Sequence, residues 1–199
     1  MELDEAIRRR RMIRAFTDQS VDPEVLDRLL DLARRCPSAG NSQGTSFLVL
    51  AGAPQTRRYW DLTLPGPRRN EFPWPGLLDA PVLVVVWVSA DIYVSRYAEP
   101  DKAATGLGAA ASAWAVPYWY VDGGMAVENL LLATTDAGLG ACFFGLFDHE
   151  PAVRAAFGVP AGWRAIGTVA VGHPAPDRPA GSAGRSRRSA DEVVHVGHW

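Results

Sequence analysis

The sequence predicts one domain that combines helices with strands. With 199 residues, 48% of them hydrophobic and 21% charged, the chain is long enough to bury one full core, and a single domain over 1–199 is expected rather than two. Apolar residues at helical spacing in 24–36 indicate a helix. A continuous β-branched run at 81–88 is typical of a strand covered on both faces.

Charge and composition argue against several classes of partner. The net charge is −2, and the first 36 residues balance eight basic with eight acidic side chains, which disfavours a nucleic-acid binder or a basic membrane helix. The acidic start lacks an apolar signal core, and the longest strongly apolar run, 80–88, is less than half of the ~20 residues that a membrane helix needs. Two cysteines make no disulfide framework, so a cytoplasmic protein is expected.

The first part of the chain is expected to alternate helices with a strand. A short amphipathic helix opens it. Asp22 as N-cap and Pro23 in the first turn start a second helix, and Pro37 ends it, because a proline disfavours helical geometry in the residue before it. A strand at 46–51 and a short helix at 54–60 follow.

The later elements are predicted from the same patterns. The stretch 64–76 is rich in proline and glycine, and it is interpreted either as a mobile flap over a pocket or as a plain surface loop with two anchoring aromatic side chains. The remaining expected elements are helices at 103–116, 125–137 and 151–157, an interruption at 117–120, strands at 141–147 and 165–172, and an added edge strand at 193–196. The helix at 125–137 is apolar nearly all round, so it is expected in the centre of the fold.

Three motif matches lack their structural context. Residues 40–44 fit the G-x-S-x-G turn of hydrolases, but that turn needs a strand before the serine and a helix after it, so Ser42 is disfavoured as a nucleophile. Residues 106–111 resemble a dinucleotide fingerprint without the preceding strand, so close helix packing is preferred. His195 and His198 have no third ligand nearby, and no metal site is predicted.

A cluster of arginines lies near the start of the chain. From Arg8 to Arg14, five of seven residues are arginine, where a short helix gives way to an extended segment. A guanidinium is always charged, and its planar fork of donors suits phosphate. Taken alone, a solvated basic helix face is the simpler interpretation. A second polar stretch at 36–43 and a third, arginine-rich one at 184–188 favour an anion-binding role.

These stretches, in this order, carry a family resemblance. The pattern runs Arg10-Arg11-Met12-Ile13-Arg14-Ala15-Phe16, then Pro37-Ser38-Ala39-Gly40-Asn41-Ser42-Gln43. It resembles the nitroreductase family of FMN-dependent oxidoreductases. The stretches at 129–142 and 167–174 are similar to the family's central helix and late strands, and 185–199 is similar to its closing signature. The resemblance spans nearly the whole chain.

The resemblance implies an α+β fold with a central, mostly antiparallel sheet flanked by helices, in an intertwined homodimer that holds two FMN molecules at its interface. The FMN-binding positions that it implies are Arg10, Arg11, Met12 and Arg14 on the phosphate, ribityl and pyrimidine side, Arg185 and Arg187 closing on the phosphate, Pro37, Ser38, Ala39, Asn41 and Gln43 from the other subunit, and the backbone of Phe144, Gly145 and Leu146 near flavin N5.

The chain departs from the family pattern at several positions. Met12 stands where serine is common, so a hydroxyl contact to the phosphate is lost, and Gly44 and Thr45 replace a frequent proline and tryptophan. Other aromatic side chains are available to stack on an acceptor or to pack in the core and dimer interface. The candidates for the substrate-facing role are Phe72, Trp74, Trp114 and Trp119.

The implied activity is hydride transfer from NADH or NADPH to flavin N5 and then to a nitroaromatic, quinone or other conjugated acceptor. Both reactants use one flavin face in turn, so no separate dinucleotide motif is needed. No catalytic side chain is assigned, because the cofactor carries the chemistry. The alternatives are a flavin-dependent dehydrogenase or oxidase of a small biosynthetic intermediate, a serine hydrolase using Ser42, and a non-catalytic anion-binding domain.

Overall fold

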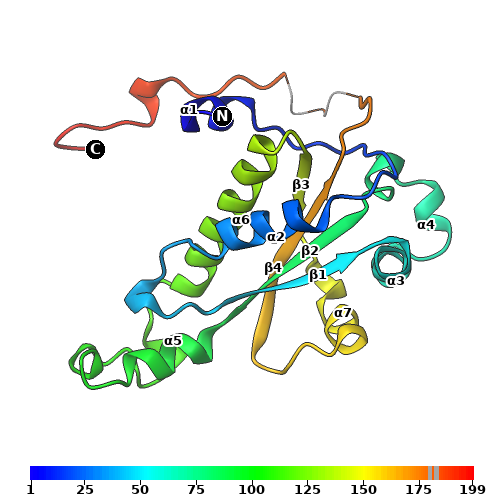
Figure 1. Ribbon diagram of the computed structural model, residues 1–199. Helices are drawn as coiled ribbons and strands as arrows, with labels where there is room; N and C mark the ends of the chain where they lie inside the picture. Colours follow the sequence, from blue (N-terminus) through cyan, green and yellow to red (C-terminus); the bar gives the residue numbers. More distant parts are fainter. Residues whose placement is uncertain (179–180, 182–183) are drawn as a thin grey trace.

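A four-stranded antiparallel sheet lies at the centre of the computed structural model, which describes residues 1–178, 181 and 184–199 (Figure 1). Its strand order is β1-β2-β4-β3, and the strands are β1 (Thr45–Ala51), β2 (Val82–Ser89), β3 (Gly140–Phe144) and β4 (Trp163–Gly172). All residues of β2 are buried, as expected for a β-branched strand covered on both faces. The predicted central antiparallel sheet is confirmed.

Helices cover both faces of this sheet. The helices α2 (Pro23–Ala33) and α6 (Tyr118–Asp136) pack on one face, where Val82, Val84 and Val86 point. The helices α3 (Ala53–Thr63) and α7 (Glu150–Phe157) pack on the other face, against Leu83 and Val85 (Figure 1). The alternation follows from the period of two along a strand. The protein therefore has an α+β fold with two hydrophobic layers.

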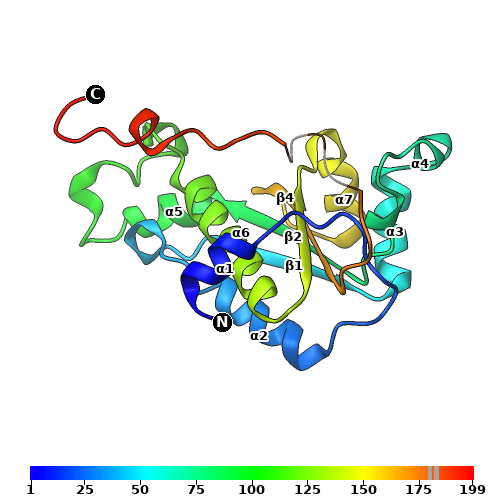
Figure 2. The same ribbon diagram turned by 90° about the horizontal axis from the view of Figure 1, so that it is seen from above.

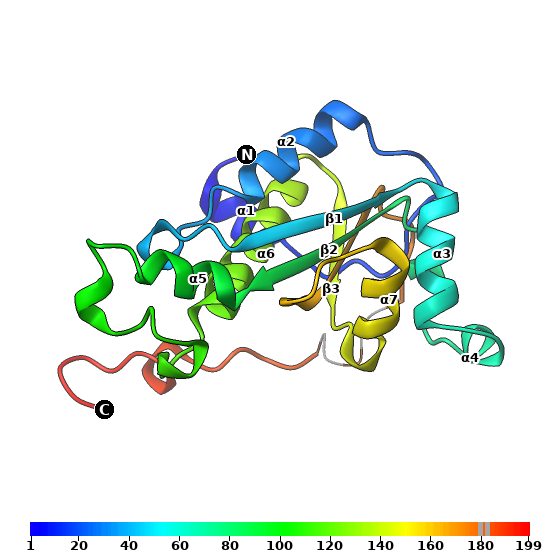
Figure 3. The ribbon, with the colours of Figure 1, turned by 90° about the horizontal axis from the view of Figure 1, so that it is seen from below.

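Shorter elements complete the described chain. The helices are α1 (Leu3–Arg9), α4 (Pro67–Asn70) and α5 (Ala90–Tyr97), and the 3₁₀ turns are η1 (Ala39–Asn41), η2 (Pro75–Leu77), η3 (Ala103–Thr105), η4 (Ala111–Ala113), η5 (Phe147–His149) and η6 (Ala190–Glu192). Seen from below, α5 lies at one end of the sheet, and α3 lies at the other end (Figure 3). None of the helices in the described residues combines the length and the hydropathy needed to span a bilayer.

Local signals explain where the helices begin and end. The Asp22 side chain accepts a hydrogen bond from the Glu24 amide at 2.8 Å, as an N-cap should. The helix α2 ends at Ala33, a few residues before Pro37, and a turn fills the space between them. Gly158 ends α7 with a φ of +68°, a left-handed conformation that glycine adopts without steric cost.

The arginine-rich segment that follows α1 runs along the edge of the sheet. Met12 forms a parallel bridge with Ala141, and the Ile13 amide donates to the Ala141 carbonyl at 2.8 Å. Phe16 pairs in antiparallel fashion with Pro174, just after β4. These bonds bring the start of the chain beside β3, although the two are far apart in sequence.

The predicted helix at 103–116 is wrong. This stretch forms two isolated 3₁₀ turns, η3 and η4, joined by irregular backbone. Gly106 adopts a φ of +74°, which ends the first turn. At Gly108 a Cβ would lie 2.4 Å from the Ala98 nitrogen, so the backbone packs closely there instead of coiling. The alanine content favours a helix locally, and the two glycines outweigh it.

Two further predictions need correction. Residues 118–120 do not interrupt a helix but form the first turn of α6, and Pro117 lies just before it at the N-cap position, where its missing N–H removes no intrahelical bond. The expected edge strand at 193–196 does not form, since η6 and irregular backbone occupy this part of the chain. Residues 184–199 instead run along the outside of the molecule, apart from the sheet (Figure 1, Figure 2). Val196 and Trp199 in this tail are 86% and 98% exposed.

Candidate functional site

A pocket of about 310 Å³ lies where the end of β3 meets α3 and the loop before β2. Its lining brings together six residues that the sequence marked as candidates, which are Arg14, Phe72, Trp74, Phe144, Gly145 and Leu146. The volume is at the lower end of the usual range for small-molecule sites. The stretch 64–76 therefore contributes a wall to a pocket, with α4 and η2 embedded in it.

The walls of the pocket are flat and aromatic. Trp60 stacks on Phe144 with an interplanar angle of 15° and ring centroids 5.7 Å apart. Phe72 meets Trp74 edge to face at 6.2 Å. Aromatic faces of this kind favour planar, conjugated ligands, because they offer large apolar contact and defined stacking geometry.

Arg14 supplies a fixed positive charge to this pocket. Its guanidinium carbon lies 5.5 Å from the centroid of the Trp74 ring, and its Nη1 donates to the Met12 carbonyl at 3.2 Å. Its backbone amide donates to Asp177 Oδ2 at 3.1 Å. Arg178 also lies 5.5 Å from the Trp74 ring but does not line the pocket. The cation–π contact and the backbone bonds hold Arg14 in place beside the cavity.

The Cys142 thiol also lies in the pocket wall. Burial raises its pKa, and the nearby Arg14 charge opposes this only in part. A thiol with a raised pKa is protonated at neutral pH and is a poor nucleophile. Cys142 is therefore a packing residue in this wall.

The other residues of the arginine cluster have different surroundings. Arg10 is half-buried, and its Nε lies 3.2 Å from Glu128 Oε1 without hydrogen-bond geometry, so this buried donor is unsatisfied in the described structure. The Arg11 guanidinium donates to the carbonyls of Arg8 and Arg10 at the end of α1. Met12 is half-buried, and its sulfur accepts from the Phe143 amide at 3.4 Å. Arg10 and Arg14 have donors available to a ligand, whereas Met12 joins the segment to β3.

The loop at 37–44 lies elsewhere, beside α5 and the start of β1, and it contributes nothing to this pocket. The candidates on it are Pro37, Ser38, Ala39, Asn41 and Gln43, of which Pro37, Asn41 and Gln43 are exposed. Arg185 and Arg187 are exposed on the C-terminal tail. A single chain therefore brings Arg14 to the end of β3, and it leaves the loop and the tail outside the pocket.

Trp114 and Trp119 also lie outside the pocket. Both are 8% exposed and pack edge to face on Tyr93, with ring centroids 5.8 and 6.0 Å away. In this chain they belong to a small hydrophobic cluster beside α5. This is the packing role weighed for them in the sequence.

Several pocket residues carry no sequence signal for this role. They are Tyr59 and Trp60 on α3, Cys142 and Phe143 on β3, and Phe147 and His149 on η5. Their common feature is proximity to the end of β3, which only the tertiary structure reveals. The predicted short helix at 54–60 contained the aromatic pair, but its orientation depends on packing against the sheet.

The rejected motifs remain without support. Ser42 follows η1 and precedes β1, which is the reverse of a nucleophile turn, and its hydroxyl donates to the Ala39 carbonyl at 2.6 Å. Gly106 lies in an irregular segment after α5, so it opens no strand-to-helix turn. In the described part of the chain, no cluster of three or more potential metal ligands is found.

Comparison with known proteins identifies relatives over nearly the whole chain. The model of the nitroreductase family matches residues 7–173. A Methanothermobacter thermautotrophicus protein with the provisional name NADH dehydrogenase/NAD(P)H nitroreductase is 26% identical over 180 residues, covering 88% of this chain and 78% of that protein. The 5,6-dimethylbenzimidazole synthase of Rhodospirillum rubrum is 30% identical over 190 residues, covering 89% of this chain and 84% of that protein. The structure of nitroreductase CinD from Lactococcus lactis, a complex with chloramphenicol, has a TM-score of 0.76 at 19% identity and covers 98% and 99% of the chains.

Proposed function

Because this chain belongs to the nitroreductase family, we propose that it is an FMN-dependent oxidoreductase that passes reducing equivalents from NADH or NADPH to a nitroaromatic, quinone or other conjugated acceptor. One observation carries the proposal. Arg14 and the backbone at 144–146 line one aromatic-walled pocket, although the sequence separates them widely. These are positions that the family resemblance assigns to the flavin.

The residues of this chain fit FMN chemically. Arg10 has a buried Nε with no hydrogen-bond partner in the described structure, and its ion-pair partner Glu128 is exposed, so a phosphate can take the place of that carboxylate. A phosphate monoester carries ~1.5–2 negative charges near neutral pH, and arginine binds such groups through paired donors. Arg14 beside a flat aromatic cavity suits the planar, electron-accepting ring of a flavin.

In this proposal the protein binds and orients FMN and the acceptor, and it keeps water away from them. FMN, when bound, supplies the hydride transfer at N5 that links the reductant to the acceptor. Arg14 would supply a positive charge on the pyrimidine side of the ring, where it would stabilise a reduced, anionic flavin. Phe72 and Trp74 offer flat surfaces for a conjugated acceptor, and their bulk keeps water from the cavity. Because reductant and acceptor occupy the same face in turn, no second nucleotide site is required.

We propose further that the site is completed by a second copy of this chain. The exposed Asn41 and Gln43 of the 37–44 loop then contact the flavin held by the partner, and the tail arginines Arg185 and Arg187 close on the phosphate. Support comes from the loop and the tail themselves, because no residue of 37–44 or 184–199 lines the pocket of its own chain.

A second candidate function is a flavin-dependent oxidation in biosynthesis with oxygen as the acceptor. The observation that favours it is the 30% identity to a 5,6-dimethylbenzimidazole synthase. It differs from the first candidate in a measurable way. It predicts oxygen uptake with a specialised substrate and slow reduction by pyridine nucleotides.

The visible absorption spectrum of the purified full chain, with FMN added if the protein is colourless, tests the proposal. Flavin bands that elute with the protein at twice the chain mass in gel filtration support the cofactor and the dimer. Rapid anaerobic bleaching by NADH or NADPH, followed by reoxidation with a nitroaromatic or a quinone, supports the reductase. Bleaching only by another substrate, with oxygen uptake, supports the second candidate. If the protein retains no flavin after reconstitution, the proposal is wrong.

A further inference from the structure

The 37–44 loop has a backbone conformation that needs support from its surroundings. Gly40, Asn41 and Gln43 have φ angles of +61°, +55° and +54°. Asparagine tolerates this left-handed region, but glutamine rarely adopts it. A non-glycine residue held there costs about 1–3 kcal/mol and persists only where other contacts dictate the conformation. Such strain commonly marks a functional segment, and the contacts that maintain it can be identified.

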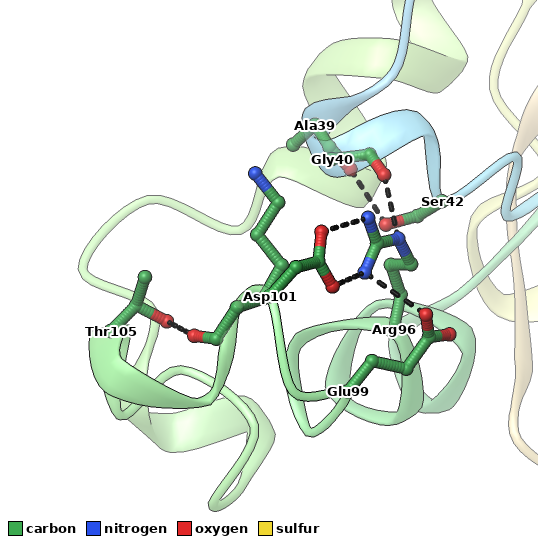
Figure 4. A network of polar contacts seen from close by, with 8 residues as sticks. Ala39, Gly40, Ser42, Arg96, Glu99, Asp101 and Thr105 are labelled. Atoms are coloured by element: carbon green, nitrogen blue, oxygen red, sulfur yellow. Dashed lines mark hydrogen bonds and ion pairs between the residues drawn. The ribbon is translucent and has the colours of Figure 1, made fainter.

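The first support comes from α5. Arg96 Nε donates to the Gly40 carbonyl at 2.9 Å, while its two terminal nitrogens bond both oxygens of Asp101 at 2.7 Å (Figure 4). Glu99 accepts a further bond from Arg96 at 3.1 Å. Figure 4 shows this guanidinium between the loop and the two carboxylates. The paired acceptors fix the orientation of the guanidinium, so its Nε donor points at the loop.

The second support comes from α6. Asp122 is 1% exposed, and its Oδ2 accepts from the Ala39 amide at 2.9 Å and from the Tyr93 hydroxyl at 2.7 Å. A buried carboxylate is costly unless it is fully hydrogen-bonded, so these bonds are strongly maintained. Burial and the neighbouring Asp122 carboxylate raise the pKa of Tyr93, which keeps its hydroxyl protonated as the donor.

Close packing leaves the loop little freedom to change. A Cβ on Gly40 would lie 2.7 Å from the Tyr97 ring, and a Cβ on Gly44 would lie 2.5 Å from the Tyr93 ring. Inside the loop, the Ser38 hydroxyl accepts from the Gln43 amide at 3.0 Å. The inward side of the loop is thus bonded to α5 and α6. The outward side presents the exposed side chains of Asn41 and Gln43.

We propose that Arg96 and Asp122 are positioning residues that hold the 37–44 loop in the conformation competent to bind FMN. The inference rests on the proposed function. Neither residue belongs to the FMN-contacting positions that the family resemblance implies, and both act through the loop backbone. If only a fraction of molecules has the competent loop, the apparent dissociation constant rises by the inverse of that fraction. Loss of one support therefore weakens FMN binding without changing the chemistry at saturation.

The test is a fluorescence titration of flavin-free full-length protein with FMN. Arg96→Met removes the bond to Gly40, and loss of a charge-assisted hydrogen bond predicts a roughly tenfold or greater rise in the FMN dissociation constant. Arg96→Lys keeps the charge without the planar fork and is expected to recover part of the loss. Turnover at saturating FMN should equal that of the wild type, which separates positioning from chemistry.

The matched control is Arg154→Met. Arg154 on α7 also pairs with a carboxylate, that of Glu150, and donates from its guanidinium to a backbone carbonyl, that of Trp163 at 3.1 Å, but it does not line the pocket and bonds no residue of the 37–44 loop. Its removal should leave the FMN dissociation constant within about twofold of the wild type, even if the thermal midpoint falls, since a difference of ~0.4 kcal/mol is a twofold change. The second support is tested by the same titration with two variants of Asp122. Asp122→Asn keeps an acceptor for the Ala39 amide, whereas Asp122→Ala does not.

Three outcomes overturn the inference. If the wild type and Arg96→Met bind FMN equally well, Arg96 has no positioning role, and the proposed function is unaffected. An equal loss of FMN affinity in Arg154→Met and Arg96→Met shows that general destabilisation is the cause. Wild-type protein that binds no FMN overturns the proposed function and this inference together. If Asp122→Ala fails to fold, the Arg96 variants still decide the question.

Discussion

Arg14 and Arg178 show how two identical side chains acquire different roles from their positions. Both guanidinium groups lie 5.5 Å from the Trp74 ring. Only Arg14 lines the pocket, while Arg178 is exposed and donates to the Pro73 carbonyl. A charge at the wall of a partly buried cavity interacts more strongly with a ligand than the same charge in solvent. The role of each arginine is therefore decided by what its guanidinium faces.

Arg14→Met is expected to weaken FMN binding roughly 10- to 100-fold, because it removes a charge-assisted interaction of ~1.5–3 kcal/mol. Methionine keeps an apolar stem of similar length, which limits the loss of packing on Trp74. The FMN dissociation constant measured by fluorescence titration checks this. Arg178→Met is the control, with an expected change of less than about threefold, as for a solvent-exposed charge. Equal effects in both variants contradict a specific role for Arg14.

The helix α6 illustrates how one element is fitted to the sheet beneath it. Its neighbouring glycines, Gly123 and Gly124, point in different directions. A Cβ on Gly123 would lie 2.7 Å from Val88 Cγ1 and 3.1 Å from Ile166 Cδ1, whereas a Cβ on Gly124 would meet nothing within 4 Å. Gly123 therefore allows the close approach of α6 to β2 and β4, and Gly124 costs helix propensity without a packing reason in this chain.

The two alanine substitutions at these positions should have opposite effects. Gly124→Ala is expected to raise the free energy of unfolding by up to about 1 kcal/mol through helix propensity. Gly123→Ala gains the same propensity, but overpacking costs ~1–3 kcal/mol, so it should be the less stable variant. Urea unfolding followed by circular dichroism measures both. The packing account of Gly123 fails if the two variants are equally stable.

At the scale of the whole molecule, several exposed carboxylates in different elements are paired with basic groups. Hydrogen bonds from Arg35 and Arg34 lower the pKa of Asp31, and the Arg96 guanidinium lowers that of Asp101. The N-terminal ammonium bonds Asp136 at 2.7 Å and lowers its pKa as well.

The lowered pKa values predict a loss of stability in acid. A carboxyl group whose pKa is lower in the folded than in the unfolded state stabilises the fold above its unfolded pKa, about 4. This contribution is lost as the pH falls through the folded pKa. The midpoint of urea unfolding should therefore fall as the pH is lowered from 5 to below 4. Asp101→Asn should reduce the slope of this dependence, whereas a stability that rises on acidification contradicts the prediction.

Much of the sheet could be predicted from the sequence, and part of the remainder could not. The four strands were predicted within a few residues, because a β-branched run or an alternating pattern reflects contacts made on each face of a strand. The helix expected at 103–116 failed because Gly106 adopts a left-handed φ and Gly108 packs closely against the backbone of Ala98. The eight-residue α5 was not expected, although it supplies Arg96 to the 37–44 loop.

The sequence by itself determined the order of the strands along the chain, the capped start of α2 and the residue types suited to an anion and a flat ring. Those features depend on neighbouring residues or on a family resemblance that runs in order along the chain. Only the tertiary structure decided that Arg14 lies beside the end of β3, that Trp60 joins Phe144 in one wall, and that Trp114 and Trp119 pack apart from the pocket. Such contacts depend on the topology of the sheet, because residues far apart in sequence meet only when strand order and register place them together.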